Sequence, residues 1–162
     1  MWLRRGLLLT ISILFAAYAA SALAGWERTR WGMTPEQVQA AMSDTRPSNG
    51  EGLQGLRERS RGRYVFANIP LTAKYYYGDD GLGLISVDVP FRRCRDALAA
   101  IICHHGQPIR TSDQVILQLA IWHDVESNTR IRAMTSSARI CSLYFEPLEA
   151  YRAGDLAGAA LL

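Results

Sequence analysis

The chain of 162 residues contains few of the residues from which recognisable metal and catalytic sites are built. It has three cysteines, three histidines and a single lysine. The histidines, at positions 104, 105 and 123, do not match H-x₃-H spacing, and no cysteine pair has the C-x₂-C spacing typical of zinc sites. Asp79-Asp80-Gly81 lacks the alternating ligands and closing glutamate of a calcium loop, so it predicts a turn. We therefore expect neither a metal site nor a cofactor.

The chain also lacks a strong excess of charge of one sign. It has 18 basic and 15 acidic residues, and two of the basic residues, Arg4 and Arg5, belong to a leading segment that we expect to be removed. The remaining 16 basic and 15 acidic residues leave the mature chain close to neutral. Proteins that bind nucleic acid depend on a basic surface, so nucleic acid is not an expected partner.

The long apolar run of the sequence lies at its N-terminus. Two arginines precede an uncharged run that begins at Leu7, and an A-x-A pattern ends at Ala24. These features are typical of a secretory signal peptide, so residues 1–24 are predicted to be cleaved after Ala24. The mature protein would then lie in the periplasm or be secreted, with no membrane span. The alternative is an uncleaved anchor, because about 18 apolar residues nearly span a bilayer.

Turn signals and periodicity predict a single domain over residues 25–148. Thr34, Pro35 and Gln37 form a capping box with proline at the first helical position, and a second helix is predicted over 92–105. Strands are predicted over 63–68, 72–77, 82–89, 114–123, 129–135 and 139–145. This order predicts an α+β fold of two helix-plus-three-stranded-meander units, α-βββ-α-βββ, with helices packed on antiparallel sheet. For residues 149–162 a short helix and a disordered tail both remain open.

The stretch WGMTPEQV, residues 31–38, combines this capping box with Val38 as the first core position. Its Gly-Met-Thr-x-x-x-Val core resembles the helix-opening motif of the small lipoprotein of the outer-membrane β-barrel assembly machinery. Gly106-Gln107-Pro108 is similar to the Gly-x-Pro that closes helices in related domains of the β-lactamase-inhibitor protein type, and the whole stretch is similar to uncharacterised exported bacterial proteins. The resemblance implies helix-then-meander units and an envelope location. It transfers no partner-binding residue, because the lipidation cysteine and the helix pair of the lipoprotein are absent.

The three cysteines predict one disulfide in an oxidising compartment. Cys94 and Cys103 are nine residues apart on the predicted second helix, so they point in opposite directions and cannot bond to each other. Cys94 lies on the apolar face of this helix, and Cys141 alternates in phase with apolar residues of the last strand. The pattern therefore predicts a Cys94–Cys141 disulfide and leaves Cys103 as a free thiol.

Four arginines in the segment RERSRGR form the candidate binding patch. Arg57, Arg59, Arg61 and Arg63 would share one face of an extended segment and could bind an anionic lipid or an acidic envelope protein. A solvated edge or loop is the alternative, because Glu58 interrupts the positive charge.

No catalytic constellation is recognised, so we expect an exported, non-catalytic binding or interaction module rather than an enzyme. The alternative is a small periplasmic hydrolase or redox enzyme that uses Cys103 with a histidine. His104 and His105 follow Cys103 directly and would point away from it on a helix, while His123 is distant in the sequence. An inhibitor-like module, in which the sheet blocks a partner enzyme, stays open beside the binding hypothesis.

Overall fold

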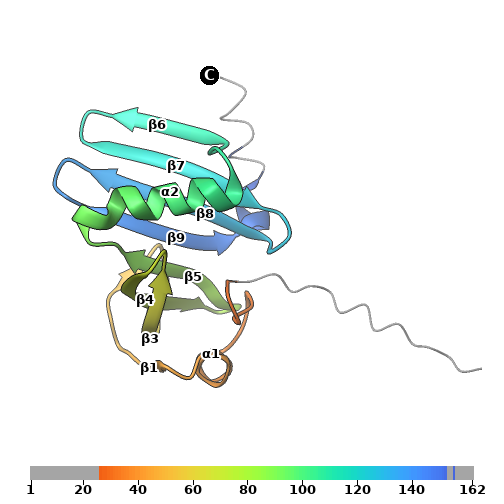
Figure 1. Cartoon of the computed structure of the whole chain (residues 1–162). Coiled ribbons are helices and arrows are strands. Elements are labelled where there is room, and N and C mark those ends of the chain that lie inside the picture. Colours follow the sequence, from red (N-terminus) through yellow and green to blue (C-terminus); the bar gives the residue numbers. More distant parts are fainter. Residues whose placement is uncertain (1–25, 153–154, 156–162) are drawn as a thin grey trace, which may run out of the picture.

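In the part of the chain that the structure describes, nine strands pair into one antiparallel sheet (Figure 1). The computed structural model describes residues 26–152 and 155, so the predicted signal peptide, residues 1–24, lies outside the described residues. The spatial order of the strands is β1-β3-β4-β5-β9-β8-β7-β6, and β2 pairs with β3. The strands are β1 Thr45–Pro47, β2 Gly52–Leu53, β3 Leu56–Phe66, β4 Ile69–Gly78, β5 Gly81–Asp88, β6 Arg110–Gln114, β7 Leu117–Asp124, β8 Thr129–Ser136 and β9 Cys141–Pro147.

Two short α-helices accompany the sheet within the described residues. α1 spans Pro35–Ala41, and α2 spans Cys94–His105 after the 3₁₀ turn η1, Phe91–Arg93. α2 lies across β7, β8 and β9, whereas α1 lies at the other end of the molecule beside β1 and β3 (Figure 1). A second 3₁₀ turn, η2 Leu148–Ala150, follows β9.

The predicted fold class, α+β with two α-βββ units, is wrong. The described residues are mostly antiparallel sheet with only two short helices, and the strands form one sheet rather than two meander units. One helix precedes five strands, and the second precedes four. Pairing between β5 and β9 makes the sheet continuous across the molecule. The helix-then-meander arrangement implied by the resemblance therefore does not describe this chain.

The missed strand boundaries have physical causes. The first part of β3 alternates arginines with Glu58, Ser60 and Gly62, so it has the composition of a solvated loop although its burial alternates as in a strand. The predicted strand 114–123 runs through Val115 and Ile116, which have strong β propensity but form the turn between β6 and β7. In both segments the pairing with neighbouring strands decides the structure.

The capping box at the start of α1 is confirmed. The Gln37 backbone N–H donates to Thr34 Oγ1 at 3.3 Å, and the Thr34 backbone N–H donates to Gln37 Oε1 at 2.9 Å. Val38 is completely buried, so the helix packs through its first core position. The stretch 31–38 therefore contains a helix start whose parts act as the sequence predicts.

The glycine of the same stretch makes a close backbone contact with the β4–β5 turn. Gly32 N–H donates to the Leu82 carbonyl at 2.9 Å, and Leu82 N–H donates to the Met33 carbonyl at 2.9 Å. Gly32 and Gly81 have φ angles of 83° and 90°. A Cβ atom on Gly81 would lie 2.3 Å from the Gly32 carbonyl oxygen, so only glycine fits there.

Gly81→Ala is therefore expected to lower the free energy of unfolding by about 2–3 kcal/mol, through the positive φ and the backbone overlap. Gly55 is a matched control, because its φ is 81° but open space surrounds its Cβ position. Gly55→Ala should lower the free energy of unfolding by about 1 kcal/mol, because the positive φ angle is the sole penalty at that position. Denaturant unfolding of both variants tests the contact, and equal losses would show that it contributes nothing.

Candidate functional site

The structure contains a disulfide between Cys94 and Cys141, the pair that the sequence predicts. The two Cα atoms are 5.9 Å apart, and the bond joins the start of α2 to the start of β9. Cys103 is a free thiol on the exposed side of α2. The disulfide therefore fixes one end of α2 against the centre of the sheet.

The four predicted arginines are all exposed on β3, but they do not share one face. The register with β4 shifts between Glu58 and Ser60, so that Arg57 pairs with Tyr77 while Arg61 pairs with Lys74. Paired residues lie on the same face of an antiparallel sheet, and positions three apart in a strand lie on opposite faces. Arg57 and Arg61 therefore face opposite ways, and the single-face arginine patch is not formed.

The surroundings of the four arginines also differ. Arg57 and Arg59 border a cleft that includes Asp79 and Asp80. Arg61 Nη2 lies 2.7 Å from Glu58 Oε1. Arg63 borders a separate shallow cleft with Lys74 and Asp88. Acidic residues accompany the arginines in each place, so the charge available for a common anionic partner is reduced.

The residues of the alternative enzyme hypothesis do not converge. Cys103 is exposed on α2, and His104 and His105 border a cleft at the end of the same helix. His123 Nε2 lies 2.9 Å from Asp155 Oδ2, in a buried group on the other face of the sheet. The described residues therefore contain no pairing of the Cys103 thiol with His123. They also contain no group of three or more His, Cys, Asp or Glu residues that could hold a metal ion.

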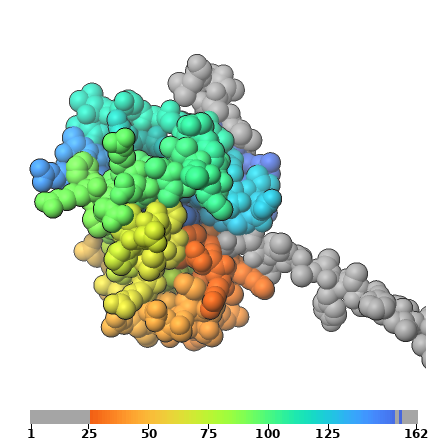
Figure 2. Space-filling model, viewed as in Figure 1, coloured from red at the N-terminus to blue at the C-terminus, as the bar shows by residue number. Residues whose placement is uncertain are grey.

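The cleft beside His104 and His105 combines several elements. It has a volume of about 500 Å³ and lies among the end of α2, the end of β3, the β7–β8 turn and the N-terminal lead-in, residues 26–33. Trp31 Nε1 donates to the Asn128 carbonyl at 3.1 Å, which ties the lead-in to the β7–β8 turn. In Figure 2 the lead-in (orange) lies beside this turn (cyan). Segments from both halves of the chain thus build this cleft.

Aromatic rings and small polar groups line the cleft. The Trp26 ring centroid is 4.2 Å from that of Tyr64 and 5.1 Å from that of Phe145. These three residues belong to the buried core and also border the cleft. Two lining residues, Glu27 and Ala67, have positive φ angles of 57° and 49°, a conformation that costs energy in residues with a side chain.

The charges of the cleft are negative. Glu27 and Asp124 supply carboxylates, and none of the described residues that line it is Lys or Arg. Burial lowers the pKa of His105 below its usual value and outweighs the opposing charge of Asp124, so His105 is neutral at pH 7. Burial and then the nearby Glu27 carboxylate raise the pKa of Tyr64 well above its usual range, so its phenol is also neutral. The cleft can therefore attract a cation against aromatic walls.

A buried ionic network on the other face of the sheet was not predicted. Asp155 binds the Arg130 guanidinium through two hydrogen bonds of 2.6 and 2.9 Å. Glu146 accepts hydrogen bonds from Arg130 and from Arg132, the latter at 2.7 Å. The Tyr151 ring lies 4.7 Å from the Arg130 guanidinium carbon. The network joins the segment after β9 to the sheet.

Only a weak sequence signal points to this network. Arg130 and Arg132 alternate with apolar residues on an interior strand, and Glu146 lies on the neighbouring strand. Buried arginines require carboxylate partners, so this alternation could have indicated an ionic pair. Asp155 gives no such signal, because it lies outside any strand in an alanine-rich segment.

None of the helices described is long and apolar enough to cross a membrane. No protein-family model and no curated protein sequence matches the chain. Among solved structures, the chain is similar to a DUF4309 family protein, YjgB, from Bacillus subtilis. The sequence identity is 12% and the TM-score is 0.42, over 70% of this chain and 78% of that chain, a likeness too low to carry a conclusion about ligand or partner.

Proposed function

We propose that the protein is an exported, non-catalytic binding protein of the bacterial envelope whose cleft at the end of α2 takes a small organic cation. The observation that carries this proposal is the composition of the cleft. Its described lining combines the Glu27 and Asp124 carboxylates with aromatic side chains and includes no Lys or Arg. A volume of about 500 Å³ suits a small molecule rather than a polymer.

The ligand would bind through its charge and its apolar body together. A carboxylate attracts an ammonium group, and the aromatic side chains of Trp26, Tyr64 and Phe145 that border the cleft offer apolar contact to the body of the ligand. His105, neutral at pH 7, adds a hydrogen-bonding group without opposing the cation. The positions of Cys103 and His123 outside this cleft favour binding over catalysis.

The ligand class can be tested with phenethylammonium and with its uncharged analogue 2-phenylethanol. Phenethylammonium should bind more tightly, and Glu27→Gln and Asp124→Asn should each weaken it about 5- to 20-fold by calorimetric titration. Glu126→Gln is the matched control, because Glu126 is an exposed acid of the same β7–β8 turn that does not border the cleft. Equal affinity for the charged and uncharged probes would contradict the proposal.

The same titration has a pH dependence with a defined sign. As the pH falls through the lowered pKa of His105, below its ordinary value of 6.5, the imidazole gains a proton and repels the bound cation. Affinity should therefore fall at acid pH below 6.5, and His105→Gln should remove most of the part of that fall that the imidazole causes. A loss that persists unchanged in this variant would assign the effect to other groups.

The export part of the proposal predicts a processing event. Expression of the full chain in a Gram-negative host should give a periplasmic product that begins at Gly25, which intact-mass measurement of the osmotic-shock fraction identifies. Ala24→Phe should block cleavage and leave the precursor, because the site requires a small residue. A full-length product that stays in the membrane fraction would instead support the uncleaved anchor.

A further inference from the structure

The turn between β6 and β7 has unusual chemistry. Gln114 pairs with Leu117, so Val115 and Ile116 alone form the turn. Two-residue hairpin turns favour Gly, Asn and Asp, whereas β-branched aliphatic residues fit them poorly. Val115 and Ile116 are nevertheless 102% and 69% exposed. These side chains therefore contribute almost nothing to the packing of the described residues and hold two aliphatic groups in water.

Other exposed apolar side chains lie at the same end of the molecule. The β8–β9 turn contacts the β6–β7 turn, because Ser137 N–H donates to the Ile116 carbonyl at 3.3 Å. It carries Ile140, which is 46% exposed, beside the disulfide residue Cys141. The disulfide holds the start of α2 here, and η1 contributes Phe91, which is 47% exposed. We refer to Phe91, Val115, Ile116 and Ile140 as the apolar end.

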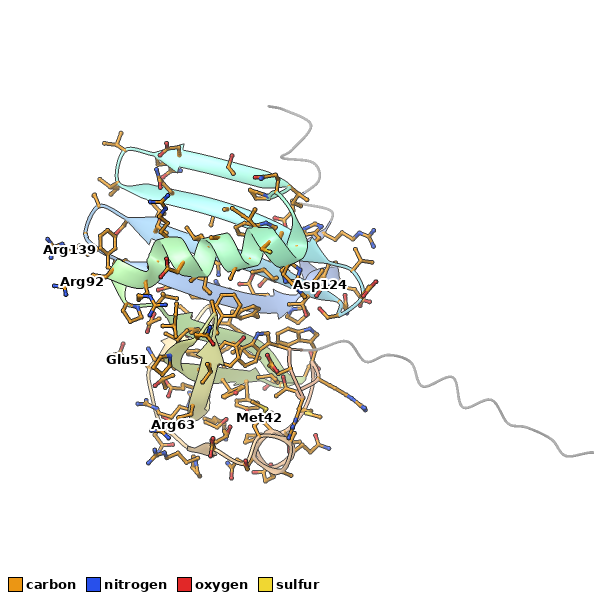
Figure 3. All side chains as sticks on the ribbon, viewed as in Figure 1. Met42, Glu51, Arg63, Arg92, Asp124 and Arg139 are labelled. Carbon is orange, nitrogen blue, oxygen red and sulfur yellow. A yellow bond between two sulfur atoms is a disulfide. The ribbon has the colours of Figure 1, made fainter. Side chains whose placement is uncertain are left out.

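Arginines border the apolar end. Arg139 lies in the β8–β9 turn and Arg92 lies in η1, and Figure 3 shows both at the same side of the molecule. Both are exposed, and within the part of the chain that the structure describes neither has an ion-pair partner. The neighbouring Arg93 forms an ion pair with Asp96, in which Arg93 Nε lies 2.7 Å from Asp96 Oδ2. The β6–β7 hairpin also carries an exposed acid, Asp113.

We infer that the apolar end docks on a membrane surface that contains anionic lipids. The aliphatic side chains of the two turns would enter the interfacial layer, while Arg92 and Arg139 bind lipid phosphates. A bilayer accepts separate protruding side chains of any arrangement. Exposed aliphatic side chains bordered by two arginines without an ion-pair partner among the described residues match the apolar interior and the anionic headgroups of such a membrane. This inference is independent of the ligand proposed for the cleft, which lies at the opposite end of α2.

The test is sedimentation of the purified chain with vesicles of phosphatidylcholine, alone or with about one third phosphatidylglycerol. Val115→Asn combined with Ile116→Gly removes both aliphatic side chains and installs the favoured Asn-Gly turn, so the fold is retained. This variant should lose at least about tenfold in vesicle affinity without losing stability. Val125→Asn is the control, since Val125 is 60% exposed in the β7–β8 turn at the opposite end. All these proteins have the same N-terminal sequence, so a difference in vesicle affinity between them arises from the substituted turn.

A second pair of variants tests the arginines. Arg92→Gln with Arg139→Gln should reduce binding to the phosphatidylglycerol vesicles to the level seen with phosphatidylcholine alone. Arg59→Gln with Arg63→Gln removes the same charge from β3 and should have little effect. Unchanged binding of the Asn-Gly variant, or no binding of the unmodified chain to either vesicle, would overturn the inference. An equal loss in both arginine pairs would overturn the assignment of Arg92 and Arg139.

Discussion

Arg130→Met is expected to lower the free energy of unfolding by about 3–5 kcal/mol. Arg130 is buried and binds two carboxylates, Asp155 and Glu146, whose side chains are 6% and 1% exposed. Methionine preserves much of the apolar volume but removes the charge. Asp155 is then left with His123 and Glu146 with Arg132, so two buried carboxylates lose their main partner. Chemical denaturation at neutral pH measures the loss.

The origin of that loss can be separated from simple truncation. In an Asp155→Leu background the same Arg130→Met change should lower the free energy of unfolding clearly less. One of the two buried carboxylates that lose Arg130 as a partner is already absent from that background. Lys74→Met is the surface control. This change breaks a 2.7 Å ion pair in which the side chains of Lys74 and Asp88 are 32% and 59% exposed. The free energy of unfolding should therefore fall by only about 0–1 kcal/mol. Additive losses for Arg130 and Asp155 would contradict the network.

The network also defines a dependence on pH. Burial by itself would raise the pKa of Asp155, but hydrogen bonds from Arg130 and His123 outweigh it and hold the pKa below its usual 3.8. A carboxyl group with a lowered folded-state pKa stabilises the protein fully above its unfolded value. This contribution disappears only as the pH falls through the lowered pKa. The unmodified chain should therefore lose stability in acid below about pH 4, more steeply than the Arg130→Met variant.

Removal of the disulfide is the second large effect. Cys94→Ala with Cys141→Ala should lower the free energy of unfolding by about 3–4 kcal/mol, because the bridge closes a loop between residues 47 apart in the sequence. Both residues are buried, so alanine avoids the added penalty of a buried hydroxyl group. Guanidinium unfolding of the oxidised protein and of the double variant gives the difference.

Cys103 provides the control for this prediction. Its side chain is exposed, so Cys103→Ala should change the stability by less than about 0.5 kcal/mol. Peptide mapping without reductant should find Cys94 and Cys141 in one linked pair. A linked peptide that contains Cys103, or a large loss for Cys103→Ala, would contradict the pairing.

Local sequence signals predicted local structure well. Thr34, Pro35 and Gln37 determine the start of α1 through contacts within one helical turn. The Cys94–Cys141 pairing follows from the helix period and the strand period of the segments that carry these residues. Sheet continuity does not follow from such signals, because pairing of β5 with β9 depends on tertiary contacts between segments more than 50 residues apart. Local signals therefore predict two separate units, whereas the described residues form one continuous sheet.

The sites were less predictable than the fold elements. The four arginines of β3 alternate in the sequence, but the bulge at Glu58 and Ser60 turns part of the set to the other face, and a one-residue irregularity has no clear sequence signature. The cleft combines Glu27 and Asp124, whose proximity arises only when the lead-in meets the β7–β8 turn. Its negative character therefore could not be read from the sequence.

The join between β5 and β9 has a consequence for the order of folding. β5 and β9 pair over four positions, Ile85–Asp88 with Ser142–Phe145, while the other strand pairs connect segments that are close in the sequence. Nearby segments associate faster because less chain entropy is lost when the loop between them closes. The two groups of strands, β1–β5 and β6–β9, are thus expected to form first. The Cys94–Cys141 bond lies next to this join, where Val89 N–H donates to the Cys141 carbonyl at 2.8 Å. In an oxidised chain the two groups are already tethered when they meet, so refolding should be faster than in the reduced chain.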